Sequence, residues 1–582
     1  MPPLRGGPGP AGGRRRGQLL RPRRPLAARH PAHQPGPHGP GRRTRHPRPV
    51  RGPHARPAGR ARRQPAPARP AVAPIAERPE RIPVSPAQRR LWLAERLSGG
   101  DAYHFPLVFR LRGTLEADAL HQALRDVAGR HEALRTVFAE HEGEPYQLIV
   151  PAAEAEPYLT VEDCPQEELD ARIGAAVGRP FDLATELPLR AEVLRVSPDD
   201  HVVAIVLHHI TTDEWSDRPF LADLDTAYRA RLEGRAPGWA PLPVQYADYT
   251  LWQRGLLGEP ADPGGEGARQ LAFWTRALTG LLEEIPLPLD RSRPAEPTGR
   301  AGTVRTELPA ETARALRAMC AETGTSMFML LHAAVATLLH RMGAGTDIPL
   351  GAPIAGRTDS ALDDLVGFFV NTLVLRTDLS GDPTFVELLD RVRNADLAAF
   401  EHQDLPFERI VEAVNPPRVP GRNPLFQVMM GYHYRPGGDP RVLDLSTEWW
   451  QARIETAKFD LDFTFVDHVE ENRVTLLLEY AEDLADRETA RALADRTVTL
   501  LGRLAADPSL PVSRVPVLTE EEREASTGAW NDTARPVERR TVPALFAETA
   551  RRRGDRVALV VDGRRMTFGE LSARAATSPR CC

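Results

Sequence analysis

The chain is poor in lysine, cysteine and long apolar runs. Of its 75 basic residues only Lys458 is a lysine, and the other 74 are arginines. Cys164 and Cys320 are isolated and two more cysteines end the chain, so no disulfide framework is predicted and a reducing, cytoplasmic location is expected. No apolar run approaches the length of a membrane span, and the basic N-terminus lacks the apolar core of a signal peptide. We therefore expect no membrane partner.

Several families of catalytic sites are also missing from the sequence. There is no HExxH and no CxxC, the spacings that would predict a zinc site, so no metal is expected. There is no GxSxG, the strand-to-helix elbow that presents a serine nucleophile in many hydrolases. Any catalytic group therefore has to come from a different motif.

Charge is distributed unevenly along the chain. The net charge is −4, but residues 1–75 hold 18 Arg and no Lys, Asp or Glu, so the remainder carries −22. An acidic folded part argues against nucleic acid as its partner. Residues 1–75 are mostly Arg, Pro, Gly, Ala and His and have too few apolar residues to offset their chain entropy, so they are predicted to be a disordered tail. A basic arm that binds acidic surfaces is the alternative.

The most informative segment is HVVAIVLHHITTDEWSDRPF, residues 201–220. Its apolar run is typical of a buried strand, and side chains alternate between the two faces of a strand, so His208 and His209 should point to opposite sides. Asp213 follows four residues after His209. A pair of imidazoles where a strand gives way to a helix is well placed to handle protons near neutral pH. The helix is predicted from an apolar side that contains Phe220, Leu221, Leu224 and Tyr228.

Two further helices are predicted. Leu120, Leu124 and Val127 recur at helical spacing and indicate an amphipathic helix. Residues 326–340 (SMFMLLHAAVATLLH) are expected to form a buried helix.

Six further motifs stand in a fixed order around the segment at 201–220. The motifs are SPAQRRLW at 85–92, RHEALRTVF at 130–138, YADYTLWQ at 246–253, VGFFVNTLVLR at 366–376, HQDLPFERIVE at 402–412 and GRNPLFQ at 421–427. Together with the segment at 201–220 they resemble the condensation domains of nonribosomal peptide synthetases, over about residues 80–515. The first two motifs are most similar to the subtype that accepts an L-configured donor.

The resemblance implies an α/β fold of two chloramphenicol-acetyltransferase-like lobes in a V with a central tunnel. The condensation domain would span residues 76–515, with lobes at about 80–259 and 268–515. A linker at 516–540 would follow, then the truncated start of an adenylation domain at 541–576, where MTFGEL is similar to an early motif of that domain, and an atypical tail at 577–582.

The resemblance also implies an acyltransferase. An acceptor amine would attack a donor thioester, and donor and acceptor would arrive on the phosphopantetheine arms of separate carrier domains. No cofactor would be bound covalently in this chain. The implied partners are the two carrier domains and the remainder of an adenylation domain.

Residue roles follow from the same resemblance. His209 would act as general base or as hydrogen-bond acceptor from the attacking amine, and His208 would face the core and orient the turn. Asp213 would pair with an arginine that holds the loop, with Arg135 as first candidate and Arg357 as second. The alternative for Asp213 is a surface ion pair worth under ~1 kcal/mol.

Four more residues are expected to support the site. Ser216 closes the motif. Trp252 is expected near the tunnel or in the core, and Asn371 is expected to contact substrate, bridge the lobes or cap a strand. Glu214 stands where the family motif has glycine. If that position needed a positive φ, glutamate would add roughly 1–2 kcal/mol of strain, and a carboxylate near His209 would raise the pKa of the imidazole.

Glu214 also motivates a second hypothesis, a non-catalytic domain of the same fold that recruits partner proteins. An epimerase of similar fold is a third. It is less favoured because HQDLPFE and GRNPLFQ are typical of condensation domains. Heterocyclisation is disfavoured because that subtype replaces the paired histidines with aspartate.

Overall fold

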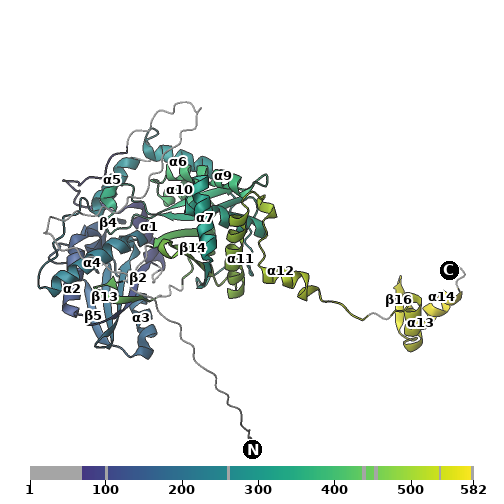
Figure 1. The fold of residues 1–582 in the computed structure, drawn as a ribbon. Coiled ribbons are helices and arrows are strands. Elements are labelled where there is room, and N and C mark those ends of the chain that lie inside the picture. The colour runs from purple at the N-terminus through teal and green to yellow at the C-terminus, as the bar shows by residue number, and fades with distance from the viewer. Residues whose placement is uncertain are drawn as a thin grey trace, which may run out of the picture. The chain divides into compact units, whose positions relative to one another are not determined.

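The computed structural model describes residues 69–98, 103–258, 262–435, 441–450, 456–536 and 539–577. Most of the predicted basic tail, and all but one residue of the predicted tail at 577–582, lie outside the described residues. Two six-stranded sheets, each packed against helices, form two lobes (Figure 1). The predicted two-lobe α/β architecture is therefore confirmed.

The sheet of the first lobe has the order β12-β13-β2-β7-β6-β5. Its central strand β7 (Asp200–His208) is buried along its whole length, as the apolar run predicts. On one face it meets the predicted amphipathic helices α2 (Ala117–Arg130) and α4 (Asp217–Leu232), and α1 (Pro86–Ser98) and α3 (Leu169–Gly178) cover the other. The remaining strands are β2 (His104–Arg112), β6 (Leu189–Ser197) and β5 (Tyr158–Asp163).

The sheet of the second lobe has the order β10-β9-β11-β14-β15-β8. The predicted buried helix is α8 (Met327–Leu339), capped by the Ser326 side chain, and it lies in the largest apolar core of the protein. The strands are β8 (Ala301–Leu308), β9 (Asp347–Ile354), β10 (Asn371–Asp378), β11 (Val428–Arg435), β14 (Leu461–His468) and β15 (Arg473–Ala481). The other helices are α6 (Glu266–Ala277), α7 (Ala310–Thr323), α9 (Phe385–Phe400), α10 (Phe407–Val414) and α11 (Arg487–Ala506).

Two segments of the second half of the chain join the first lobe. Strand β13 (Leu445–Trp449) pairs with β2, with Trp449 opposite Phe109, and β12 (Arg441–Val442) extends that edge. Phe368 and Phe369 pack into the first lobe's core. The lobes are therefore not the two contiguous ranges that the sequence predicts, because periodicity identifies a strand without identifying the sheet it joins.

The packed part of the chain begins at Arg69, earlier than the predicted boundary at residue 76. Val72 is only 6% exposed, and its backbone N–H donates to Asp359 at 3.1 Å. The N–H of Ile75 donates to Asp248 at 3.1 Å. A Pro-rich composition hides these contacts because they are made mainly by the backbone.

Beyond residue 515 the predicted linker contains structure. Helix α12 (Glu520–Thr527) is tied to α11 by an ion pair between Glu522 and Arg496 at 2.6 Å. Residues 541–577 form α13 (Val542–Arg552), a hairpin of β16 (Val557–Val561) and β17 (Arg564–Thr567), and α14 (Phe568–Thr577).

One described helical stretch, Met327–Ala344, has the length and apolar character that a membrane span would need. Two-thirds of it is buried inside the second lobe, as expected of a core helix.

Candidate functional site

Strand β7 determines which way the two histidines point. Val202, Ala204 and Val206 belong to the core beneath α1 and α3, whereas Val203, Ile205 and Leu207 belong to the core beneath α2 and α4. His208 continues the first series and is fully buried. Its Nδ1 accepts a hydrogen bond from the N–H of Ile210 at 3.1 Å, and its Nε2 lies 3.6 Å from Glu95. His208 therefore anchors the turn from inside the lobe, where the alternation places it.

His209 begins the short 3₁₀ turn His209–Thr211 and is half-buried. Its Nδ1 lies 2.8 Å from the carbonyl oxygen of Thr212, which can only accept, so Nδ1 carries the proton of the neutral ring. Edge-on contacts with Phe105 of β2 (5.6 Å) and with Phe368 from the second half of the chain (5.2 Å) fix the orientation of the ring. Its Nε2, a lone-pair acceptor in this tautomer, makes no hydrogen bond to any described residue.

Burial lowers the pKa of His209 to about 3, and the positive charge of Lys458 acts in the same direction. A carboxylate next to His209 would shift this pKa in the opposite direction, but removal from water dominates at this position. The imidazole is therefore neutral at every pH near neutrality. It is a hydrogen-bond acceptor and a much weaker base than an unperturbed histidine.

Asp213 is fully buried and joins the two lobes. Its Oδ1 lies 3.3 Å from Nη2 of Arg357, and its Oδ2 accepts from the N–H of Phe369 at 2.8 Å. Ser216 donates to Asp213 at 2.8 Å, and its Oγ also lies 2.8 Å from Arg357 Nη2 and 3.2 Å from the N–H of Gly367. Asp213 and Ser216, which both belong to the segment 201–220, therefore bind residues of the second half of the chain.

The arginine that pairs with Asp213 is Arg357, the second candidate, and not Arg135. Arg135 instead donates to the carbonyl oxygen of Val150 at 2.5 Å and lies 3.8 Å from Glu132. Arg357 follows Gly356, whose φ is +63° and at which a Cβ atom would collide with the carbonyl oxygen of Phe369. The guanidinium lies 4.3 Å from the centre of the Phe369 ring. Arg357 is therefore built into the segment that crosses between the lobes.

Glu214 does not carry the strain that its replacement of glycine suggested. Among the described residues it is not one of those with positive φ, so its backbone suits any residue. Its carboxylate points to His433 of β11, 3.1 Å from Nδ1, and not to His209. Burial raises the pKa of Glu214 to about 7 and that of the neighbouring Asp217 to about 6. Glu214 therefore faces the sheet of the second lobe.

Trp252 and Asn371 have structural partners. The Trp252 indole N–H donates to the carbonyl oxygen of Pro70 at 3.1 Å, and its ring stacks on Tyr249. Asn371 opens β10. Its amide donates to Gln403 and Leu405 at 2.9 Å, and its Oδ1 accepts from two backbone N–H groups. Trp252 therefore secures the N-terminal segment, and Asn371 fixes the loop that carries HQDLPFE.

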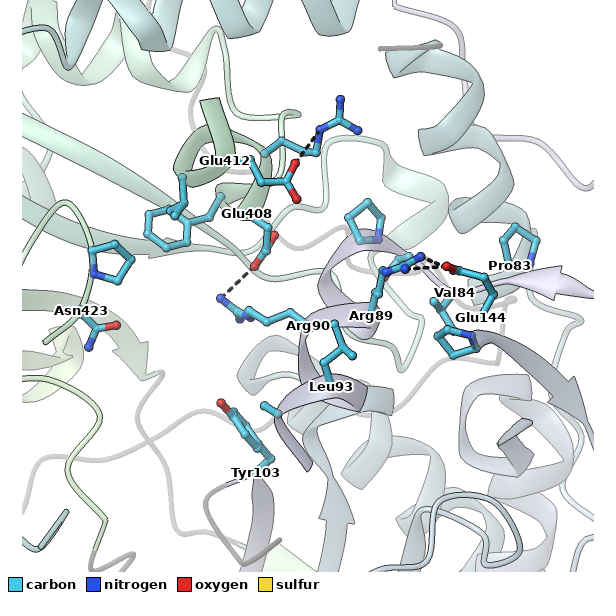
Figure 2. A pocket seen from close by; sticks show the side chains of 18 of the residues that line it. Pro83, Val84, Arg89, Arg90, Leu93, Tyr103, Glu144, Glu408, Glu412 and Asn423 are labelled. Carbon is cyan, nitrogen blue, oxygen red and sulfur yellow. Dashed lines mark hydrogen bonds and ion pairs between the residues drawn. The ribbon is translucent and has the colours of Figure 1, made fainter. Parts of the chain in front are cut away.

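A cavity of about 1190 Å³ lies between the lobes, chiefly between α1 and α10. Figure 2 shows Arg90 of α1 reaching Glu408 of α10, an ion pair of 2.9 Å. His209 is not among the lining residues, but Tyr103 and Lys458 are, and the Tyr103 carbonyl oxygen accepts from the N–H of His209 at 2.8 Å. Tyr103 thus connects the lining of the cavity to the backbone of His209.

The rim of this cavity is rich in unpaired positive charge. Arg81, Arg254 and Arg418 line it and are exposed, and none makes an ion pair or side-chain hydrogen bond with a described residue. Guanidinium groups bind phosphate through paired N–H donors, so this rim suits a phosphate-bearing ligand. Within the described ranges no group of three or more His, Cys, Asp or Glu side chains is placed to hold a metal ion.

Sequence comparison places these features among known proteins. The condensation-domain family matches residues 79–526. The chain is 45% identical over 505 residues to a dimodular nonribosomal peptide synthase of Bacillus subtilis, which covers 86% of this chain and 21% of that protein. It is 40% identical over 511 residues to an isonitrile lipopeptide synthase of Mycobacterium tuberculosis, and that alignment covers 85% of this chain and 20% of that protein. The chain thus spans about a fifth of the length of these relatives.

Solved structures agree with the sequence comparison. The X-domain in its complex with OxyB from teicoplanin biosynthesis is 37% identical, with a TM-score of 0.71 over 78% of this chain and 99% of that one. A four-domain nonribosomal peptide synthetase bound to AMP and glycine has the same TM-score at 22% identity. That alignment covers 85% of this chain and 38% of the other, and it shows likeness of fold.

Proposed function

Because this chain belongs to the condensation-domain family, we propose that it forms an amide bond between a carrier-bound aminoacyl or peptidyl thioester and a carrier-bound aminoacyl acceptor. The observation that carries the proposal is the state of His209. Its Nδ1 proton is donated to Thr212, which leaves the Nε2 lone pair as the acceptor in a ring of fixed orientation. Such a group can accept a hydrogen bond from an attacking amine.

The reaction needs little more than this acceptor and good placement. The amine nitrogen forms a bond to the donor carbonyl carbon, the carbon–sulfur bond breaks, and the proton lost by the nitrogen ends on the departing thiol. With a pKa of about 3, His209 is suited to orienting the amine N–H and to passing a proton on at once, rather than to holding it. Placing two tethered reactants end to end contributes up to roughly 10⁵ M or more of effective molarity.

The cavity supports delivery on phosphopantetheine arms. Arg81, Arg254 and Arg418 surround its opening, and each arm carries a phosphodiester near the carrier surface. We infer that the donor and acceptor come from separate carrier domains and that the chain binds no covalent cofactor of its own.

The direct test is a condensation assay on the full 582-residue chain with separately loaded donor and acceptor carriers. A panel of aminoacyl donors and acceptors is mixed pairwise, and the intact mass of the acceptor carrier is followed. The expected result is a mass gain equal to the donor acyl group, which forms roughly 10²- to 10⁴-fold more slowly in His209→Ala. A folded wild-type chain that transfers no acyl group from any donor would overturn the proposal.

A second candidate function is the recruitment of a partner protein without catalysis. Two observations favour it: Glu214 in place of the motif glycine, and the 37% identity to an X-domain that was solved in complex with OxyB. Glu214→Gly separates the two functions. If Glu214 suppresses catalysis, the variant should gain amide-forming activity over the wild type. Equal turnover would remove the structural basis of this candidate.

Three narrower proposals concern the configuration of the donor, the identity of residues 541–576 and the location of the protein. The first two motifs support an L-configured donor, which the donor panel would test through paired enantiomers. Residues 541–576 are similar to the start of an adenylation domain, and four apolar residues of β16 are 43–59% exposed, a surface that the rest of such a domain would cover. A cytoplasmic location fits the two described cysteines, which are free thiols.

A further inference from the structure

Lys458 is the one lysine of the chain, and it lines the cavity beside His209. Arginine is the basic residue at all 74 other positions, so position 458 is the one exception to the chain's use of arginine. Arginine offers a planar fork of donors, whereas lysine offers a compact point charge on a flexible stem. The difference matters where a single oxygen atom has to be reached in a confined space.

The backbone around Lys458 is fixed on both sides. The Asn423 amide donates to the Lys458 carbonyl oxygen, and the N–H of Ala457 donates to Gly299 at 2.7 Å. Two residues later, Asp460 forms an ion pair with Arg293 at 2.5 Å, and both of those side chains are largely buried. The stem of Lys458 therefore starts from a rigid base.

The ammonium group itself is free. It makes no ion pair and no hydrogen bond with a described residue, and its nearest recorded neighbour is the Tyr103 ring, 6.0 Å from the ring centre. Tyr103 is the residue whose carbonyl oxygen holds the backbone of His209. The Lys458 side chain is exposed, and the carboxylates of Glu479 and Asp462 favour its charged form. A cation without an ion-pair partner among the described residues thus lines the cavity beside Tyr103, the residue that binds the backbone of His209.

We propose that the Lys458 ammonium contacts the thioester carbonyl oxygen of the donor and stabilises the negative charge that develops on it during amine attack. The inference rests on the proposed amide-forming function and names a catalytic residue for it. As the nitrogen–carbon bond forms, the carbonyl π electron pair moves to oxygen, and when the carbon–sulfur bond breaks the pair returns. Lys458 keeps its own proton throughout, because it stabilises the oxyanion by charge and hydrogen bonding.

The kinetic test compares two donors that carry the same acyl group. One is the carrier-bound phosphopantetheine thioester, and the other is the N-acetylcysteamine thioester, which has no phosphate. Lys458→Met should lower kcat about 10²- to 10³-fold with both donors, the loss typical of one oxyanion donor. Lys458→Arg should recover part of the loss, since the charge is kept. In contrast, Arg418→Met should raise KM only for the carrier-bound donor.

The outcomes separate the two proposals. No amide from the wild-type chain with any donor overturns the proposed function. A wild type that forms amide beside a Lys458→Met variant of unchanged kcat overturns the role of Lys458 alone. A loss confined to the phosphate-bearing donor also overturns it, because it assigns Lys458 to the phosphate.

A labelling experiment requires no turnover, so it remains decisive if the methionine variant does not fold. An acetyl N-hydroxysuccinimide ester should modify the wild-type chain at two amines, Lys458 and the N-terminus, which mass spectrometry resolves. A pantetheine analogue with CH₂ in place of the thioester sulfur, at about ten times its Kd, should slow labelling of Lys458 about tenfold and leave the N-terminal amine unaffected. Unchanged labelling of Lys458 at saturating analogue would overturn the contact.

Discussion

Nη2 of Arg357, in the segment that leaves β9 of the second lobe, lies 3.3 Å from Oδ1 of Asp213 in the first lobe, and both side chains are almost fully buried. The two are separated by 144 positions in sequence. The turn that presents His209 is thus held in place by the opposite half of the chain, and its geometry depends on the contact between the lobes.

Removing either member of this pair should destabilise the protein strongly. Asp213→Ala or Arg357→Met leaves a buried charge without its partner, at a cost of roughly 3–5 kcal/mol in the free energy of unfolding. The double variant should lose less than the sum of the two, because no lone charge remains. Urea unfolding followed by circular dichroism measures all three.

The matched control is the pair Arg195–Asp163, which has the same 3.3 Å separation but is exposed. Breaking it should cost under ~1 kcal/mol. Arg135→Met should show no coupling to Asp213→Ala, since Arg135 binds Val150 instead. Additive losses for Asp213 and Arg357 would contradict the structure.

The two histidines should differ in the kind of damage that their loss causes. His209→Ala removes an acceptor on a half-buried ring, so kcat for amide formation should fall by roughly 10²- to 10⁴-fold while the unfolding midpoint changes little. His208→Ala removes a fully buried ring and the acceptor for the Ile210 N–H, so it should lower stability by roughly 2–5 kcal/mol. Single-turnover assays and melting curves on both variants check this. A loss of stability in His209→Ala together with a loss of kcat alone in His208→Ala would contradict the assignment.

The pKa of His209 predicts a pH effect of definite sign. An unfolded histidine binds its proton near pH ~6.5, whereas folded His209 does so only near pH 3, so between these values the unfolded state holds more protons. Stability from this residue should therefore fall as the pH drops from about 6.5 towards 3. His209→Gln should flatten that slope, and NMR titration of the ring should show no protonation of His209 at pH 5.

Glu214 should act in the opposite direction. Its folded pKa of about 7 exceeds that of an unfolded glutamate, so its contribution to stability is present at low pH and is lost as the pH rises towards 7. Because 49% of the Glu214 side chain is exposed, solvent weakens this effect, and Glu214→Gln should stabilise the protein only slightly above pH 7. The pH dependence of unfolding for the variant and the wild type, measured in the same buffers, tests the sign.

The N-terminal segment allows a sharp truncation test. Removing residues 1–68 should leave the melting temperature unchanged if none of the domain's packing depends on them. Removing residues 1–75 should lower it, because Val72 is buried and the N–H groups of Val72 and Ile75 are bound to Asp359 and Asp248. Equal melting temperatures for the two truncations would show that these contacts contribute nothing.

The local parts of the site could be predicted from the sequence, and its long-range parts could not. Alternation along β7 places His208 inside, and helical spacing identifies α4 and α8, because these patterns depend on neighbouring residues. The choice of Arg357 over Arg135 could not be made, since it depends on how a distant segment crosses between lobes. The direction in which Glu214 points stayed open for the same reason, because its neighbour His433 lies on a distant strand.

Lys458 carried a signal that was not used to predict the site, because a single lysine among 75 basic residues is a compositional anomaly. Asn371 was selected from the sequence, but the choice among its possible roles could not be made. Three of its four hydrogen bonds go to backbone groups of Gln403, Leu405 and Phe407, which are distant in sequence.

The exchange of β12 and β13 into the first sheet has a consequence for how the protein can be divided. A fragment that ends near residue 258 would lack these strands and would leave β2 as a bare edge, open to pairing with other copies. Such a half should aggregate when it is expressed alone and become soluble when the other half is supplied in trans. The two lobes, although each has its own core, are therefore interlocked during assembly and cannot be treated as exchangeable building blocks.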